Sequence, residues 1–534
     1  MASSLTLRMP RLAGAFAVAM GVASLGAAPA RAEKLTIGLG GSVNSLDPHF
    51  YSTTPNNLVA FHIFDRLVDR MADGKLAPGL ATAWRATSPT VWEFTLREGV
   101  TWHDGKPFTA DDVAFTLKRA LDVPNNLGGF AGIIRPITGV EVAGPLLIRL
   151  TTATPIPNLP SDLTRLAIVS RHAGQDATTA DYNSGKAAIG TGPFKFSAYQ
   201  PGERIELVAN DTWWGKKPAW TSVTLRLIPN VAVRTAALLA GDIDVIDQPS
   251  ASDLPRLQSS DKVKVAEIAG MRVNYVVPMI QPAPDAPAVL DKKGAKIEPS
   301  PLTKQKVREA LSLAINRAGI TERVVLGTAT PTGQWLPAGI PGYDAKTPVP
   351  AYDVQKAKKL LGEAGFPDGF RLTLSTANDR TPYSVEVAQA LAQMWSRIGV
   401  EVAIDAMPFS VYSTRGAKSQ FSAYLGSWSN NSMEGTGLLR DLLATRSQQT
   451  GWGLYNWAQY SNPALDALTT AAISETDEAR REKLVLDAVK LVSSDVAIIP
   501  LYHFKNIWAT RAALRYDPRI DELTLATDVH KAGK

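Results

Sequence analysis

Two different periods of apolar and polar residues follow one another early in the chain. Residues 92–97, WEFTLR, alternate large or apolar side chains with polar ones, which is the period of a half-buried strand. Across residues 113–121 the apolar side chains recur at helical spacing instead. Residues 104–106, Asp-Gly-Lys, favour a turn between them, because glycine accepts backbone angles that other residues resist. The stretch 92–122 therefore predicts a strand, a turn and a helix.

The start of that helix carries its own signal. Thr109 is a good capping residue, and Asp111 and Asp112 place negative charge at the positive end of the helix dipole. Similar signals precede other helical patterns further along the chain. These further helix starts are predicted at Thr303, Asp353 and Thr381.

The second half of the chain has a regular rhythm. Between residues 352 and 405, helical and strand patterns alternate twice. Such alternation is typical of an α/β fold with a mostly parallel sheet and helices on its faces. Two longer apolar runs, residues 271–280 and 497–510, predict buried strands outside this region.

The first 32 residues have the pattern of a secretory leader. Arg8 and Arg11 precede an apolar run from residue 12 to residue 28, and Ala30-Arg31-Ala32 follows it. A basic segment, an apolar core and small residues around a cleavage site are typical of a signal peptide, and we expect cleavage after Ala32. The run is too short and too rich in Gly and Ala to favour a membrane span.

Composition narrows the class of protein further. The chain of 534 residues has 45% hydrophobic and 20% charged residues, which is ordinary for a globular protein of more than one domain. Loss of the three arginines in the leader would lower the net charge from +6 to +3, so we expect no nucleic-acid partner. The absence of cysteine excludes disulfides, thiolate metal sites and a lipidated cysteine.

Several segments carry a resemblance to a known family. Residues 98–113, EGVTWHDGKPFTADDV, resemble the hallmark of the extracellular solute-binding proteins that serve ABC importers for peptides and nickel. Residues 190–218, residues 234–244 and the helical pattern 307–317 are similar to further elements of this family. The resemblance covers nearly all of residues 33–526. It implies a periplasmic protein that binds a solute, works with the permease of an ABC importer, is a monomer and uses no cofactor or metal.

The resemblance also implies how the chain is divided. The expected fold is a large two-lobed periplasmic-binding-protein fold of the type II class, with an extra subdomain in the first lobe and a hinge of two crossing strands. Lobe I would span residues 33–270, with the extra subdomain at about 77–190. Lobe II would span residues 271–502, and residues 503–534 would return to lobe I.

The resemblance places part of the ligand site in residues 421–435, FSAYLGSWSNNSMEG. In peptide-binding members, a tryptophan here precedes an aspartate that pairs with the α-amino group of the peptide. Trp428 matches the tryptophan, but Asn430 or Asn431 stands where the aspartate is expected. A neutral amide cannot offer the charge-assisted hydrogen bond that an ammonium group favours. Recognition of a free peptide amine is therefore open, and Glu434 in a shifted register is an alternative.

Other candidate contacts come from the segment after the first strand, which lies along the interlobe cleft in this family, and from aromatic residues elsewhere. The predicted ligand-binding residues are Ser42, Val43, Asn44, Trp335, Trp428, Ser429, Asn430, Asn431 and Tyr455.

A peptide or peptide-like solute is the expected ligand, and an opine, an oligosaccharide or a metal chelate is the alternative. Nickel is less expected because no histidine lies near Trp428 in the sequence. A secreted hydrolase is a more distant alternative, because the chain has no G-x-S-x-G, H-E-x-x-H or Walker-type motif. We therefore expect no enzymatic activity.

Overall fold

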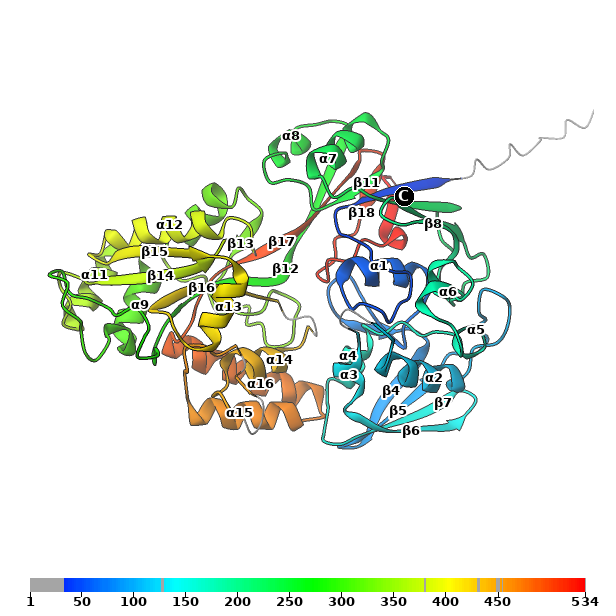
Figure 1. Ribbon diagram of the computed structural model, residues 1–534, viewed down its shortest axis with the longest axis horizontal. Helices are drawn as coiled ribbons and strands as arrows, with labels where there is room; N and C mark the ends of the chain where they lie inside the picture. The colour runs from blue at the N-terminus through cyan, green and yellow to red at the C-terminus, as the bar shows by residue number, and fades with distance from the viewer. Residues whose placement is uncertain are drawn as a thin grey trace, which may run out of the picture.

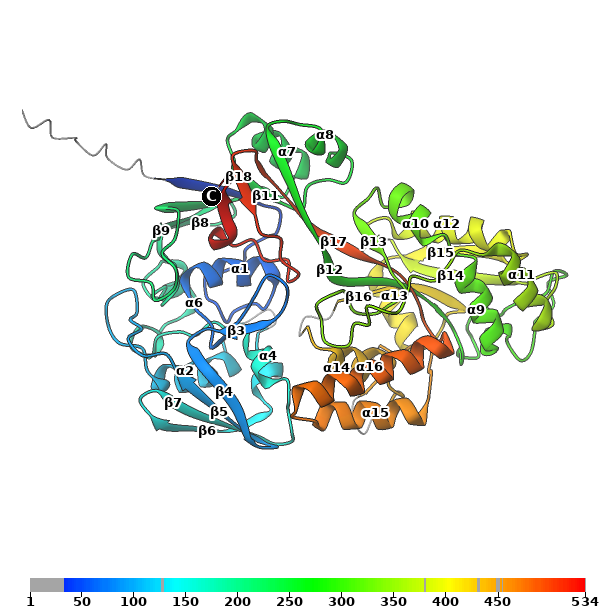
Figure 2. The same ribbon diagram turned by 180° about the vertical axis from the view of Figure 1, so that it is seen from behind.

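The molecule has two lobes that lie side by side (Figure 1). The computed structural model describes residues 33–125, 129–378, 381–429, 433–447, 452–453 and 455–533, so the predicted leader lies outside the described residues. Two long strands, β12 (Val263–Pro278) and β17 (Ile499–Arg511), run together from one lobe into the other (Figures 1 and 2).

In the described part of the chain, one eleven-stranded sheet continues through both lobes. Its order is β15-β14-β16-β12-β17-β11-β1-β10-β9-β8, with β13 paired to β17. β14 pairs in parallel with β15 and β16, which confirms the parallel arrangement predicted there. The other strands of this sheet are β1 (Lys34–Leu39), β8 (Phe194–Gln200), β9 (Arg204–Ala209), β10 (Ser222–Leu227), β11 (Val245–Asp247), β13 (Ala329–Pro331), β14 (Arg371–Ala377), β15 (Glu401–Met407) and β16 (Ala423–Ser429).

Strand β12 gains a second partner where it enters lobe II. Residues 263–269 of β12 pair with β17 beside β11, whereas residues 272–278 pair with β16, and residues 273–276 also remain paired with β17. The register between β12 and β17 shifts between Ala269 and Val273. At Gly270 an added Cβ would lie 2.5 Å from the side-chain oxygen of Asn506, so glycine permits a close approach here.

Lobe I contains a smaller sheet as a separate layer. Its order is β4-β5-β7-β6, with β4 at Ala81–Ser88, β5 at Val91–Leu96, β6 at Ile137–Gly144 and β7 at Leu147–Thr152. Helix α2 (Ala110–Leu121) contacts β6 and β7, and apolar side chains of both layers share one core. The turn before α2 has Gly105 at φ 87°, as the sequence predicted.

Side chains at the helix starts explain which predictions succeeded. Thr109 is the N-cap of α2, and its backbone N–H donates to the Asp112 carboxylate at 3.0 Å. Asp353 caps α11 (Val354–Glu363), where its carboxylate accepts from the Lys356 N–H. Both predictions are confirmed.

Two predicted starts are wrong. The Thr303 hydroxyl donates to the Ser300 carbonyl within a short 3₁₀ turn, and α9 (Gln305–Leu313) begins two residues later. The Thr381 carbonyl accepts from the N–H and the hydroxyl of Ser384, so α12 (Ser384–Ser396) starts only there. In each case a local hydrogen bond holds the chain in a turn.

The remaining elements complete the two lobes. In lobe II, α14, α15 and α16 form a helical layer below the sheet (Figure 1). The tail after β17 packs on lobe I, where Trp220 Nε1 donates to the Val529 carbonyl at 3.1 Å. The other elements are β2 (Val68–Arg70), β3 (Leu76–Pro78), β18 (Leu514–Tyr516), β19 (Val529–Lys531), α1 (Thr54–Ile63), α3 (Ala131–Ile134), α4 (Leu159–Leu163), α5 (Arg171–Gly174), α6 (Thr179–Asn183), α7 (Val231–Ala240), α8 (Leu254–Gln258), α10 (Arg317–Gly319), α13 (Phe409–Ala417), α14 (Gly435–Leu438), the π-helix η3 (Leu439–Leu443), α15 (Pro463–Ser474) and α16 (Glu478–Asp495).

Candidate ligand-binding cleft

A cavity of about 960 Å³ lies between the lobes. Lobe I contributes residues at and around α4, and lobe II contributes residues of β12, β14, β16, η3 and the segment before α15. The charged and aromatic residues that line it are Asp162, Arg165, Arg272, Tyr275, Phe409, Tyr412, Trp428, Arg440, Asp441, Trp452, Tyr455 and Trp457. A cavity of this size suits a small solute that is largely enclosed.

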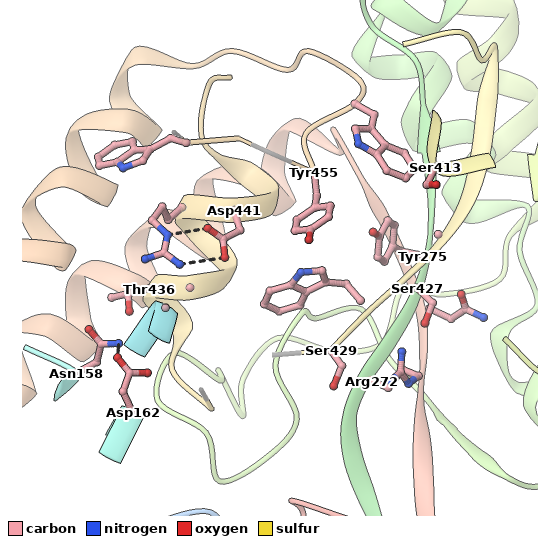
Figure 3. Close-up of a pocket in the computed structure, with 18 of the residues that line it drawn as sticks. Asn158, Asp162, Arg272, Tyr275, Ser413, Ser427, Ser429, Thr436, Asp441 and Tyr455 are labelled. Atoms are coloured by element: carbon pink, nitrogen blue, oxygen red, sulfur yellow. Dashed lines mark hydrogen bonds and ion pairs between the residues drawn. The ribbon is translucent and has the colours of Figure 1, made fainter. Parts of the chain in front are cut away.

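Aromatic side chains form the middle of the cavity. Tyr275 and Tyr455 lie between Asp441 on one side and Ser427 on the other (Figure 3). Tyr455 is 44% exposed, so its ring is available to a ligand. Trp428 is the penultimate residue of β16 and is only partly buried against the lobe II core. This surface can pack against an apolar or planar part of a solute.

Carboxylates occupy one side of the cavity. Asp441 is held by the guanidinium of Arg440, with its Nε at 2.6 Å and Nη2 at 3.1 Å from the two oxygens. The Asp162 carboxylate accepts from the Asn158 amide at 3.0 Å. Burial raises the pKa of Asp162 to about 6, although the charges of Arg165 and Arg440 act in the opposite direction. Asp162 is thus a partly desolvated acid at the cavity wall.

The opposite side of the cavity is basic. Arg272 lies on β12 directly across from Ser429 on β16, and the two side chains are neighbours in Figure 3. Asp162 and Arg272 lie at opposite sides of that view. Asp162 and Asp441 thus have Arg165 and Arg440 beside them, whereas Arg272 lies apart from these acids.

A second cavity of about 500 Å³ adjoins the first. Arg165, Arg272 and Ser429 line both cavities. The second cavity continues past residues 52–57 of lobe I toward residues 520–523 of the tail.

Glu434 does not line either cavity. It is 8% exposed and precedes α14 as its N-cap residue. Burial raises the pKa of Glu434 to about 7, with Arg481 and Arg70 acting in the opposite direction. Its place under the cavity wall gives the shifted-register alternative no direct support.

The sequence-predicted site residues divide into three groups. Trp428, Ser429 and Tyr455 line the large cavity. Ser42 and Asn44 are exposed, Val43 is buried in lobe I, and none of the three lines either cavity. Trp335 is a correction to the expectation: it is 1% exposed and packs in the lobe II core with its ring 5.5 Å from that of Tyr275. Asn430 and Asn431 lie outside the described residues.

Most lining residues were not predicted, among them Asp162, Arg272, Tyr275, Arg440 and Asp441. Arg272 had a visible signal, because it is a charged residue in the otherwise apolar run 271–280. The other residues can be identified as cavity residues only in the folded structure, where segments that are distant in the sequence lie together. Among the described residues, there is no group of three or more His, Cys, Asp or Glu that could hold a metal ion.

Comparisons with known proteins agree with this architecture. The family described as bacterial extracellular solute-binding proteins, family 5 middle, matches residues 75–449. The chain is 28% identical over 478 residues to heme-binding protein A of Haemophilus influenzae, covering 84% of this chain and 83% of that protein. It is 26% identical over 513 residues to the dipeptide-binding protein of Escherichia coli, covering 90% and 91%.

A solved structure, HbpA2 from Haemophilus parasuis, has the same fold. Its TM-score is 0.81 at 24% identity, covering 93% of this chain and all of that chain. No helix of the described residues has the length and apolarity needed to cross a membrane.

Proposed function

We propose, from the premise that this chain belongs to the bacterial extracellular solute-binding proteins of family 5, that it captures a peptide or peptide-like solute in the interlobe cleft. Proteins of this family bind solutes for ABC importers and are not enzymes. The observation that carries the proposal is the cavity of about 960 Å³ whose wall is built from both lobes. We further propose that the solute is delivered to a membrane permease.

Capture would proceed by hinge closure. The lobes are connected through β12 and β17, and a rotation there would bring α4 of lobe I toward β16 and η3 of lobe II. Closure would remove water from the cavity and strengthen the polar contacts to the solute. The closed shape is what a permease would recognise. In this scheme the protein acts in the periplasm after removal of its leader, as a monomer and without a cofactor.

The chemistry of the cavity supports a peptide-like solute. Asp162 and Arg272 lie at opposite sides, as the two ends of a zwitterion require, and Trp428 and Tyr455 can pack on a side chain between them. Asp162 takes the role that the family's aspartate has in recognising an amine. Relatives named as binding dipeptides, di- and tripeptides and glutathione are consistent with this class.

A thermal-shift panel of peptides, opines, oligosaccharides and metal chelates tests the proposal. Binding to the folded state alone raises the unfolding temperature by mass action, so we expect short peptides to raise it. A shift with non-peptide solutes only would refute the peptide assignment.

A parallel titration with haem, followed by its absorbance spectrum, addresses the similarity to heme-binding protein A. Haem requires an axial ligand such as histidine, methionine or tyrosine, and the large cavity has only tyrosines among these in its described lining. We expect no specific haem spectrum. A saturable one, lost on removal of a lining tyrosine, would replace peptide with haem as the solute.

A further inference from the structure

One loop of the tail packs in the hydrophobic cores of both lobes. The loop follows β18, comprises residues 517–525 and lies between α1 and β12 in both views, where it is coloured red (Figures 1 and 2). Leu523 and Leu525 of this loop pack in the lobe I core. Ile520, in the same loop, is 1% exposed and packs in the lobe II core instead. The loop therefore contacts both lobes through buried apolar side chains.

Lobe I holds the backbone of this loop. The Ile520 N–H donates to the Ala72 carbonyl at 3.0 Å, in the turn between β2 and β3. Arg519 Nη2 donates to the carbonyl of Arg70, the last residue of β2, at 2.8 Å. The same guanidinium forms an ion pair with Asp521 at 2.6 Å, so the buried Arg519 side chain is held within the loop as well. These contacts fix the position of the loop relative to lobe I.

A crossing strand also holds the loop. The buried Asn506 of β17 donates from its side-chain amide to the Arg519 carbonyl at 3.0 Å and to the Ile520 carbonyl at 3.1 Å. One side chain thus satisfies two buried backbone acceptors, which need hydrogen-bond partners. Asn506 lies opposite Ile268 of β12 in the paired crossing strands. The loop is therefore attached where the chain passes between the lobes.

Side chains of lobe II surround Ile520 next to the turn between β2 and β3. A Cβ added at Gly74 in this turn would lie 3.0 Å from Ile340 Cδ1 and 3.2 Å from Ile520 Cγ2. The same Cβ would lie 3.9 Å from Met433 Sδ, so three apolar side chains converge on Gly74. Ile340 and Met433 are buried members of the lobe II core. Lobe I, the tail and lobe II thus meet in one apolar contact.

We propose that residues 519–522 are a strap between the lobes, which limits the orientations that the lobes adopt before a solute binds. The backbone of the strap is fixed to lobe I and to β17, while its Ile520 side chain packs in lobe II. Rotation of one lobe against the other must therefore carry Ile520 with it or break a close-packed contact. A narrower range of orientations lowers the conformational entropy that is lost when the lobes close on a solute.

Double electron–electron resonance between two spin labels, one on each lobe, tests the strap in the ligand-free protein. The chain has no cysteine, so Lys118→Cys in α2 and Ala471→Cys in α15, both at exposed positions, would provide the only labelling sites. Ile520→Ala should broaden the distribution of distances between the labels. We expect orientations outside the original range to become about tenfold or more populated, because truncation of a buried isoleucine weakens its contact by more than the ~1.4 kcal/mol that corresponds to a factor of ten.

Three further variants separate the strap from general loss of stability. Ile315→Ala makes the same truncation at a fully buried position elsewhere in lobe II, and it should lower the unfolding temperature without broadening the distribution. Ile340→Ala should broaden the distribution as Ile520→Ala does, and the double variant should add little, since both changes remove one contact. Ile520→Val should give a smaller broadening, and it serves as the test if the alanine variant does not fold.

Two outcomes would overturn the strap. An unchanged distance distribution in the Ile520 variants, with only a lower unfolding temperature, would show that Ile520 stabilises the fold without restricting the lobes. Equal broadening in Ile315→Ala would show that the lobes respond to any loss of core packing. Neither outcome bears on solute capture, because the labelled protein carries no solute and the thermal-shift panel tests capture separately.

Discussion

Two arginines, Arg119 in lobe I and Arg272 in the cleft, show how this molecule uses charge for different purposes. The Arg119 fork donates to both oxygens of Asp47, at 2.9 and 2.7 Å, and also contacts His49 Nδ1 at 3.0 Å. Its guanidinium lies 4.5 Å from the centre of the Tyr182 ring. Arg272 has no comparable partner among the described residues. The charge that supports the fold of lobe I is fully paired, whereas the charge in the cleft has no hydrogen bond or ion pair among the described residues.

The neighbours of Arg119 reinforce this contrast. Burial alone would raise the pKa of Asp47, but the hydrogen bonds and charge of Arg119 hold it below its usual range. Burial lowers the pKa of His49 to about 4, and its Nε2 donates to the Ala167 carbonyl. His49 is thus a neutral structural residue, and with Asp47 it fixes the end of the segment that follows the first strand.

The largest expected effect comes from removing the ion pair between Arg119 and Asp47. Arg119→Met should lower the free energy of unfolding by about 3–5 kcal/mol, because it leaves the buried Asp47 without a counter-charge. Urea denaturation of the ligand-free protein measures this loss. The same change at the exposed Arg226 is the control, and a loss below about 1 kcal/mol at Arg119 would show that the pair is not structural.

The next largest effect concerns the aromatic side chains that line the large cavity. Trp428→Ala should weaken solute binding by about 2 kcal/mol, or roughly thirtyfold, while the protein stays folded, since aromatic anchors dominate many binding sites. Trp335→Phe is the matched comparison: this buried tryptophan lines no cavity, so its change should lower stability and leave affinity unchanged. Calorimetry and thermal melting separate the two outcomes. Unchanged affinity in Trp428→Ala would remove Trp428 from the site.

A smaller effect should appear as pH dependence at Asp162. Its pKa is raised from 3.8 to about 6 in the folded protein, so between these values the folded state binds its proton more tightly than the unfolded state. Stability is therefore present in full below pH 3.8 and is lost as pH rises through 6. Asp162→Asn should be more stable than the unaltered protein by roughly 2 kcal/mol at pH 7.5, with the difference vanishing near pH 4.

Urea denaturation of both proteins at several pH values measures this difference. His49 provides the opposite sign within the same window: its lowered pKa means that stability falls as pH decreases from 6.5 through 4. Comparison with Asp162→Asn at each pH cancels the contribution of His49. A difference that does not change with pH would contradict the raised pKa of Asp162.

The smallest effect tests the turn before α2. Gly105→Ala should lower the free energy of unfolding by about 1 kcal/mol, because φ of 87° is unfavourable for any residue with a Cβ. No atom lies within 4 Å of the position of the added Cβ, so the backbone alone determines the result. Gly362→Ala, at a helical glycine with equally open surroundings, should be neutral or stabilising, and equal losses at both positions would refute this explanation.

The sequence predicted elements correctly where the residues that determine an element are close to it in the sequence. The strand, turn and helix of residues 92–122 and the cap at Asp353 depend on neighbouring residues only, and the structure has them. Thr303 and Thr381 failed although they are also local, because a hydroxyl or carbonyl can complete a turn as readily as a helix cap.

The cleft could be predicted only in part. Trp428 was predicted through a resemblance to relatives and Tyr455 as an aromatic residue, whereas Asp162 and Arg272 line one cavity from segments 110 residues apart in sequence. Asp521, which forms an ion pair with Arg519, lines the second cavity together with Arg272 although it lies nearly 250 residues away in sequence. No local sequence pattern predicts contacts between segments so far apart. Trp335 was predicted only because it is aromatic, and its burial in the lobe II core is visible only in the fold.

The shift in register at Gly270 has a consequence for hydrogen exchange of the backbone amides in the crossing strands. Backbone amides that lie in a continuous ladder are protected, whereas those at an interruption can open without unfolding either side. The pairing of the crossing strands is interrupted between residues 269 and 273 and again between residues 274 and 275, and an added Cβ at Gly270 would lie 2.5 Å from the side-chain oxygen of Asn506. We therefore expect the amides near Gly270 to exchange faster than those of the continuously paired residues 263–269.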